Sequence, residues 1–262
     1  YINIDLSDKR ALDQCLRNTG PDLIIHTAAM TNVDACELNQ SLCDKMNVGL
    51  VEHIVKFCKT NKVRLIHLST DFIFDGKKGD IYKEDDKPDP VNHYGMSKLK
   101  SEAVIREAEI DHAILRTILV YGLVDGNDRS NIVLWVKKSL EDKKHINVVT
   151  DQLRMPTLAD DLAEACWLAV KHEVKGVYHV SSSELMSIYE IALAVADVFG
   201  LDKKYIHPVG TEALSLPAKR PWSTGFDLNK SVKEIKLPVY SFFERLQVFK
   251  DQIDKLEGRM SV

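Results

Sequence analysis

Tyr94 and Lys98 stand four residues apart at the start of a helical pattern, and this spacing places two side chains on one face of a helix. An ammonium beside a phenol favours the phenolate and lowers the pKa of the phenol toward working pH. The hydroxyl of Thr70 follows an apolar run from Val63 to Leu68 and can hydrogen-bond an oxygen that is being protonated. The three residue types therefore predict proton transfer to a carbonyl group as a hydride reaches it from elsewhere.

The sequence predicts alternating strands and helices that would position these residues. The run from Val63 to Leu68 is predicted to be a buried parallel strand that ends in Ser69-Thr70-Asp71, and Tyr94 opens a helix that continues to about Ala108. Further strands are predicted at 1–4, 22–27, 113–121, 146–149 and 176–180, and further helices at 5–18, 39–60, 131–140, 158–171, 187–199 and 241–256. The pattern is typical of an α/β fold with its site at the carboxyl ends of the strands.

The composition argues against a nucleic-acid-binding, membrane-spanning or disulfide-rich protein. The 35 basic and 39 acidic residues give a net charge of −4, which offers no general basic surface for nucleic acid. No apolar run reaches the ~18 residues of a membrane span. The five cysteines form no C-x-x-C pair, so we expect reduced thiols in a cytoplasmic protein and no metal site. His26 and His67 sit inside apolar strands and are predicted to be core histidines.

The segment Ser-Thr-Asp-Phe-Ile-Phe-Asp-Gly (69–76), followed by Tyr94-Gly-Met-Ser-Lys98, resembles the dTDP-4-dehydrorhamnose reductase family of the extended short-chain dehydrogenase/reductase superfamily. That family also includes the regulatory beta subunit of methionine adenosyltransferase. The resemblance implies a Rossmann-type, mostly parallel, doubly wound sheet with a smaller C-terminal substrate lobe. We expect an NAD(P)-binding domain over 1–175 and a substrate-binding lobe over 176–262, with 123–145 able to join that lobe.

The resemblance also implies roles for individual residues. The expected catalytic residues are Thr70, Tyr94 and Lys98. The expected contacts with NADP or NAD are Asp5, Leu6, Ala28, Ala29, Met30, Thr31, Asn47, Leu68, Tyr94 and Lys98. For Asn47, an exposed amide on a helix surface is an equally good interpretation. The expected contacts with the substrate are Thr70, Asp71, Leu119 and Arg220.

The sequence departs from the family pattern in two ways. Neither G-x-x-G-x-x-G nor G-x-G-x-x-G occurs, although in a dinucleotide-binding fold this loop follows the first strand and faces the pyrophosphate. We therefore expect an opening strand–helix–strand unit to be missing from this sequence. Around the sugar, Leu119 stands where the reductases often have Trp, Phe72 where many have Tyr, and Arg154 where Gly is usual.

Two functions of different classes follow from the resemblance. The first is NAD(P)H-dependent reduction of a 4-keto nucleotide sugar. The alternative is a non-catalytic regulatory subunit that binds NADP and the catalytic subunit of methionine adenosyltransferase, because the departures at Phe72, Leu119 and Arg154 fit relaxed selection on sugar binding. In either case we expect a cytoplasmic protein, without nucleic acid or membrane partners, that can form a homodimer.

Overall fold

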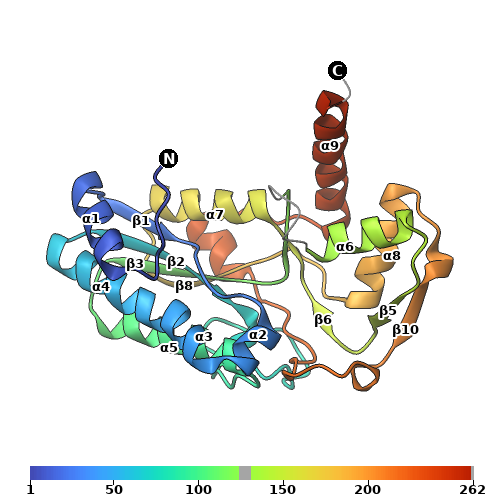
Figure 1. Cartoon of the computed structure of the whole chain (residues 1–262), viewed down its shortest axis with the longest axis horizontal. Helices are drawn as coiled ribbons and strands as arrows, with labels where there is room; N and C mark the ends of the chain where they lie inside the picture. The colour runs from blue at the N-terminus through green and yellow to red at the C-terminus, as the bar shows by residue number, and fades with distance from the viewer. Residues whose placement is uncertain (124–130, 261–262) are drawn as a thin grey trace.

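The computed structural model describes residues 1–123 and 131–260, and its centre is a four-stranded parallel sheet (Figure 1). The strand order is β1 (Leu23–His26), β2 (Arg64–Thr70), β3 (His112–Thr117) and β8 (Gly176–Val180). Because all four strands run in the same direction, their carboxyl ends meet at one edge of the sheet. The predicted α/β fold with a parallel sheet is confirmed.

Helices cover both faces of this sheet (Figure 1). Helices α1 (Lys9–Thr19), α4 (Leu50–Asn61) and α5 (His93–Glu107) lie on one face, and α7 (Ala159–Lys171) lies on the other. Alternate strand residues serve the two faces, so Leu65 packs with α1 and α4 while its neighbour Ile66 packs with α7. The sheet is therefore doubly wound, as the resemblance described above implies.

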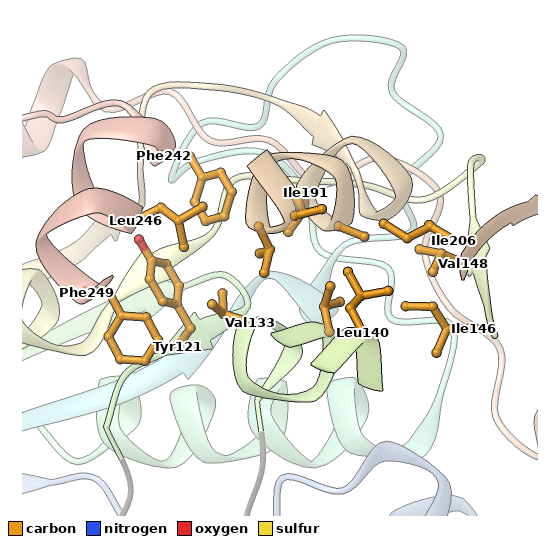
Figure 2. Packing of buried hydrophobic residues seen from close by; sticks show 14 of the residues in the cluster. Tyr121, Val133, Leu140, Ile146, Val148, Ile191, Ile206, Phe242, Leu246 and Phe249 are labelled. Atoms are coloured by element: carbon orange, nitrogen blue, oxygen red, sulfur yellow. The ribbon is translucent and has the colours of Figure 1, made fainter. Parts of the chain in front are cut away.

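A second lobe packs around three helices, α6 (Ile132–Glu141), α8 (Ile188–Phe199) and α9 (Phe242–Met260). Figure 2 shows its apolar centre, where Tyr121 lies edge-on to Phe242 and Phe249 of α9. A two-stranded parallel sheet of β5 (Ile146–Val149) and β10 (Ile206–Val209) completes the lobe. These segments lie far apart in the sequence, so the lobe is held together by long-range burial of apolar side chains.

The chain passes between the two lobes more than once. Strand β8 begins at Gly176 but belongs to the large sheet, whereas α6 and β5, which precede it, pack in the second lobe. A division after residue 175 therefore separates β8 from its own sheet. Helix α6 lies within the segment 123–145, whose assignment to a lobe stays a prediction, and residues 124–130 of this segment lie outside the described residues.

The remaining elements are short. They are the helices α2 (Val33–Leu38) and α3 (Gln40–Asp44), the π turns Lys45–Gly49 and Ser231–Ile235, the 3₁₀ turns Asp71–Ile73, Lys203–Tyr205 and Thr211–Ala213, and the strands β4 (Val120–Tyr121), β6 (Leu153–Arg154), β7 (Thr157–Leu158) and β9 (Met186–Ser187).

Three predicted elements differ from the structure. Residues 1–4 form no strand, since the segment pairs with none of the described strands and leaves the side chains of Tyr1 and Ile2 exposed. The predicted strand 113–121 is interrupted at Leu119, whose φ of 42° lies in the left-handed region and cannot continue a strand. The predicted helix 39–60 is interrupted by the π turn Lys45–Gly49.

Within the described part of the chain, no helix combines the length and the apolar character that crossing a lipid bilayer requires.

A buried ion pair attaches α5 to the sheet. The guanidinium of Arg116 on β3 donates to both carboxylate oxygens of Glu102 on α5, with Nε–Oε1 at 3.0 Å and Nη2–Oε2 at 2.8 Å. Ser69 on β2 donates to the same carboxylate at 2.6 Å. Both partners of the ion pair are at most 1% exposed. One carboxylate therefore joins α5 to two neighbouring strands.

We predict that Arg116→Met lowers the free energy of unfolding by ~3–5 kcal/mol, because it leaves the Glu102 carboxylate buried without its main partner. The double variant Arg116→Met/Glu102→Leu is expected to recover most of this loss. Urea unfolding measures both, with Lys100→Met as control, since the exposed Lys100–Asp44 pair should contribute no more than ~1 kcal/mol. Equal losses in Arg116→Met and Lys100→Met would contradict the prediction.

Candidate functional site

A pocket of about 560 Å³ opens at the carboxyl ends of the strands of the large sheet. It is bordered by both lobes, since Ile188 of α8 lines it together with residues of β2 and α5. The candidate site residues predicted from the sequence that line it are Ala29, Thr31, Leu68, Thr70, Asp71, Tyr94, Lys98, Leu119 and Arg220. The predicted catalytic residues therefore share one pocket.

Thr70 and Tyr94 come together because the 3₁₀ turn after β2 packs against the first turn of α5. Gly95 permits this packing, since a Cβ atom built on it would lie 2.0 Å from the carbonyl oxygen of Phe72. Asn92 begins the helix by accepting a hydrogen bond from the Gly95 N–H at 2.9 Å. The rings of Phe72 and Tyr94 meet edge to face with centroids 5.8 Å apart. The close approach brings the Tyr94 phenol beside the Thr70 hydroxyl.

The Lys98 ammonium is held from behind by groups of β2. Its Nζ donates to the carbonyl oxygen of Leu68 at 2.7 Å and lies 3.0 Å from Nε2 of His67. The side chain is 3% exposed and borders the pocket. An ammonium has three N–H donors, so one remains for a ligand in the pocket.

Burial has the largest effect on the pKa values of Tyr94 and Lys98. It raises the pKa of Tyr94 well above its ordinary value, and the neighbouring Thr70 hydroxyl offsets only part of that rise. Burial also lowers the pKa of Lys98 to about 8, against the opposing effects of Glu102 and Cys43. The expectation that Lys98 brings the phenol's pKa down toward working pH is thus wrong for this structure, because desolvation of the phenolate prevails. The phenol remains neutral and keeps a proton to donate.

Asn47 orders the loop that follows β1. Its side chain accepts from the N–H of Met30 at 2.7 Å and donates to the Met30 carbonyl at 3.0 Å and to Ser97 of α5 at 2.9 Å. At 1% exposed it is not a surface amide. It lies in the π turn Lys45–Gly49 and holds Met30, whose chain neighbours Ala29 and Thr31 line the pocket.

The other predicted cofactor contacts are spread more widely. Ala28 packs against the apolar core beneath the pocket. Leu6 lines a separate, smaller pocket, and the exposed Asp5 accepts hydrogen bonds from the backbone and hydroxyl of Ser7. The structure therefore gathers Ala29, Thr31, Leu68, Tyr94 and Lys98 at the large pocket, but not Asp5, Leu6, Ala28, Met30 or Asn47.

At the substrate end, protein groups already engage Asp71. Its carboxylate lies 3.5 Å from Nε of Arg154, and it accepts hydrogen bonds from the hydroxyls of Thr70 and Thr224. Burial raises the pKa of Asp71, while Arg154 and these hydroxyls oppose the rise. The Arg154 guanidinium also donates to the carbonyl of Pro221 at 2.7 Å. Arg154 thus occupies space beside the carboxylate that was expected to meet a sugar.

Leu119 and Arg220 also lie at the substrate end of the pocket. Leu119 lines the pocket with its strained left-handed backbone, a feature that clusters at functional sites. Arg220 borders the pocket while donating to Asp34 at 2.8 Å and to the carbonyl of Ala218 at 2.7 Å. Both predicted positions are therefore at the site, although Arg220 is partly committed to protein partners.

Sequence reasoning missed the positions of several residues that shape the pocket. Gly95 lies within the Tyr94–Lys98 motif, but only the structure reveals its contact with Phe72. The apolar surroundings of His67 predict only a core position, since its contact with Lys98 is made across 31 positions of the sequence. Gln152 and Arg154 line the pocket from the second lobe, and the only signal for Arg154 was its departure from the family pattern.

The lining fits the nicotinamide and ribose end of a dinucleotide. Small residues, Ala29 and Thr31, follow β1 and leave the strand end open to a planar group. Leu68 offers apolar surface, and Lys98 retains an N–H for a ribose hydroxyl. A metal site has no comparable support, since the described residues contain no group of three His, Cys, Asp or Glu side chains suited to holding an ion.

We predict that the buried Lys98 makes stability rise with pH. Its pKa is about 8 in the folded protein, against 10.5 for an unperturbed lysine, so between these pH values the unfolded chain binds more protons. The unfolding free energy of wild type minus that of Lys98→Met should increase by ~3 kcal/mol across this window. Urea unfolding of both proteins between pH 7 and 10 measures the difference, in which shared groups such as Tyr94 cancel. A difference that stays flat with pH would contradict the prediction.

Comparisons with known proteins agree with this geometry. A family model described as the RmlD substrate binding domain matches residues 2–254. The chain is 32% identical over 235 residues to methionine adenosyltransferase 2 subunit beta of Rattus norvegicus, covering 88% of this chain and 70% of that protein. It is 35% identical over 219 residues to the spore coat polysaccharide biosynthesis protein SpsK of Bacillus subtilis, covering 83% and 75%.

A solved structure shows the same fold. It is the dTDP-4-dehydrorhamnose reductase of Bacillus anthracis in complex with NADP, which superposes with a TM-score of 0.88 at 28% identity and covers 95% of this chain and 87% of that one. A family match over nearly the whole chain, supported by fold and by sequence, decides the assignment. The chain belongs to the dTDP-4-dehydrorhamnose reductase family of extended short-chain dehydrogenases/reductases.

Proposed function

We propose that this protein reduces the keto group of a nucleotide sugar with NADPH or NADH. The observation that carries the proposal is the meeting of Thr70, Tyr94 and Lys98 in one pocket, with the Tyr94 phenol buried and neutral. A neutral phenol is the form that a general acid needs when a carbonyl is reduced. NADP in the related Bacillus anthracis reductase supports the choice of cofactor.

Each residue then has a distinct task. The Thr70 hydroxyl, which donates to Asp71 in the absence of substrate, turns to hold the carbonyl oxygen of the substrate, and the adjacent Tyr94 phenol donates its proton to that oxygen. Lys98 uses its remaining N–H to bind the ribose of the cofactor, with Ala29, Thr31 and Leu68 beside the nicotinamide. The bound cofactor supplies the hydride. The adjacent Thr70 hydroxyl stabilises the resulting phenolate by hydrogen bonding.

The two lobes divide this work in the proposal. The lobe built on the large parallel sheet holds the cofactor, while the second lobe covers the substrate, with Arg220 directed to the diphosphate of the substrate because a guanidinium suits phosphate oxygens. Asp71 and Leu119 complete the sugar contacts. A cytoplasmic location and a homodimer remain predictions.

A second candidate function is regulation of methionine adenosyltransferase through binding of its catalytic subunit. One observation favours it: Arg154, Thr224 and Thr70 already engage the Asp71 carboxylate, so a sugar hydroxyl would have to compete with these partners. The similarity to the rat beta subunit supports the same alternative. The two candidates differ in whether the pocket still orients a sugar.

Leu119→Trp tests that difference. If the protein is a reductase, a flat ring at this position should stack on the hexose, contribute ~0.5–1.5 kcal/mol and lower KM for a dTDP-4-keto-6-deoxyhexose by ~2–10-fold. The backbone strain is unchanged in kind, since Leu and Trp both carry a Cβ. NADPH oxidation by the intact protein measures the effect, with Leu38→Trp on the exposed face of α2 as control.

The same proteins are tested in a pull-down with the methionine adenosyltransferase catalytic subunit. Steady NADPH oxidation by wild type without capture of the catalytic subunit supports the reductase and excludes the regulatory function. Capture without oxidation of NADPH by either form would overturn the reductase.

A further inference from the structure

Three buried side chains from three different elements form a hydrogen-bonded row behind the pocket. His26 ends β1, His67 lies in the middle of β2, and Lys98 lies on α5. Nζ of Lys98 is 3.0 Å from Nε2 of His67, and Nδ1 of His67 is 3.0 Å from Nδ1 of His26. His67 is 0% and His26 is 6% exposed. The row connects Lys98 through β2 to β1, the edge strand of the sheet.

The chemistry of the ammonium determines the protonation of the whole row. An ammonium can only donate, so Nε2 of His67 accepts and the proton of this ring sits on Nδ1. His26 must then accept at Nδ1 and carry its proton on Nε2. The Ser101 hydroxyl, 3.3 Å from Nε2 of His67, does not compete for that nitrogen, because it donates to the carbonyl of Lys98 at 2.7 Å.

His26, the member of the row farthest from Lys98, has an energetically unfavourable feature. Nε2 of His26 is buried and has no hydrogen-bond partner among the described residues. An unpaired buried donor is unfavourable, and an apolar side chain at position 26 would avoid it. A row that served only to fill the core would gain nothing from this arrangement, whereas a row that holds a buried ammonium gains a fixed acceptor for it.

The acceptor stays in place over a wide pH range. Burial, with Lys98 nearby, holds the pKa of His67 well below its ordinary value, and burial lowers that of His26 to about 4. The other titratable groups that act on Lys98 are Glu102 of its own helix and Cys43 of α3, both of which favour its charged form. At neutral pH the imidazoles are therefore neutral acceptors beside a cation.

We propose that His67, held in its tautomer by His26, is a positioning residue that aims the Lys98 ammonium at the ligand pocket and keeps it charged. With His67 and the Leu68 carbonyl binding two N–H groups, the third is directed to the ligand. The inference rests on the proposed function only in giving Lys98 a ligand to bind. The row itself is a property of the folded protein and is tested without turnover.

Two variants of the intact protein distinguish a His67 that positions Lys98 from a His67 that only fills the core. His67→Gln retains an acceptor oxygen close to the site of Nε2, while His67→Leu has similar bulk and no acceptor. NMR titration of lysine labelled at Cε and Nζ follows Lys98, with Lys98→Met identifying its signal. We expect the pKa of Lys98 to fall by about 1 unit in His67→Leu and to stay near the wild-type value in His67→Gln. His53→Leu, which removes a histidine paired with Asp13 outside the pocket, should leave it unchanged.

A second measurement covers the case in which His67→Leu does not fold. The ¹⁵N shifts of the His67 ring in the wild-type protein should show a proton on Nδ1 and none on Nε2, and a proton on Nε2 would overturn the proposal. An unchanged Lys98 titration in folded His67→Leu would overturn it as well.

Activity then distinguishes this inference from the proposed function. If the intact protein reduces nucleotide sugars, the alkaline limb of its pH–rate profile should move down by the same ~1 unit in His67→Leu and return in His67→Gln. A shifted Lys98 titration in a protein that turns over no sugar would leave the positioning role standing and remove the reductase. Turnover of the sugar by a protein whose Lys98 titration is unchanged in His67→Leu would support the reductase and remove the positioning role.

Discussion

The bidentate ion pair between Arg116 and Glu102 is the constraint on which the rest of the site depends. Glu102 follows Lys98 by four residues and Tyr94 by eight, so all three side chains lie on one face of α5. Fixing Glu102 against β3, with Ser69 of β2 on the same carboxylate, therefore sets the rotation of the helix about its axis. That rotation brings Tyr94 beside Thr70, and it directs Lys98 toward the end of β2.

Burial of this face has opposite consequences for the two groups that would act in chemistry. It raises the pKa of the Tyr94 phenol and lowers that of the Lys98 ammonium, so each is driven toward its neutral form. For the phenol this is useful in a reduction, because the proton is retained until the carbonyl oxygen takes it. For the ammonium it is a penalty, and the acceptors at Leu68 and His67 offset it. The same low-dielectric surroundings thus prepare the acid and require the support behind the lysine.

Much of this arrangement follows from local sequence. The Tyr94–Lys98 spacing, the strand that ends at Thr70, and the helix predicted over 187–199 follow from patterns among nearby residues, and the structure contains each of them. The strand expected over 1–4 is absent, because a strand exists only with a paired neighbour, which local pattern does not supply. The local sequence also does not predict the break in the strand at Leu119, since leucine has no preference for the left-handed backbone that tertiary packing imposes there. The role of His67 depends on a partner 31 residues away and could not be read from its apolar surroundings.

The central claim is that Tyr94 gives its proton to a nucleotide-sugar carbonyl as that carbon is reduced. A single-turnover reaction of the intact protein with NADPH deuterated at the transferred position and dTDP-4-keto-6-deoxyglucose tests it most directly, with wild type and Tyr94→Phe compared by mass spectrometry of the sugar. We expect deuterium at the former keto carbon in wild type, and transfer slower by ~10²–10⁴-fold in Tyr94→Phe with cofactor binding unchanged. Deuterium transfer at the wild-type rate in Tyr94→Phe, or no deuterium in the sugar with either protein, would contradict the claim.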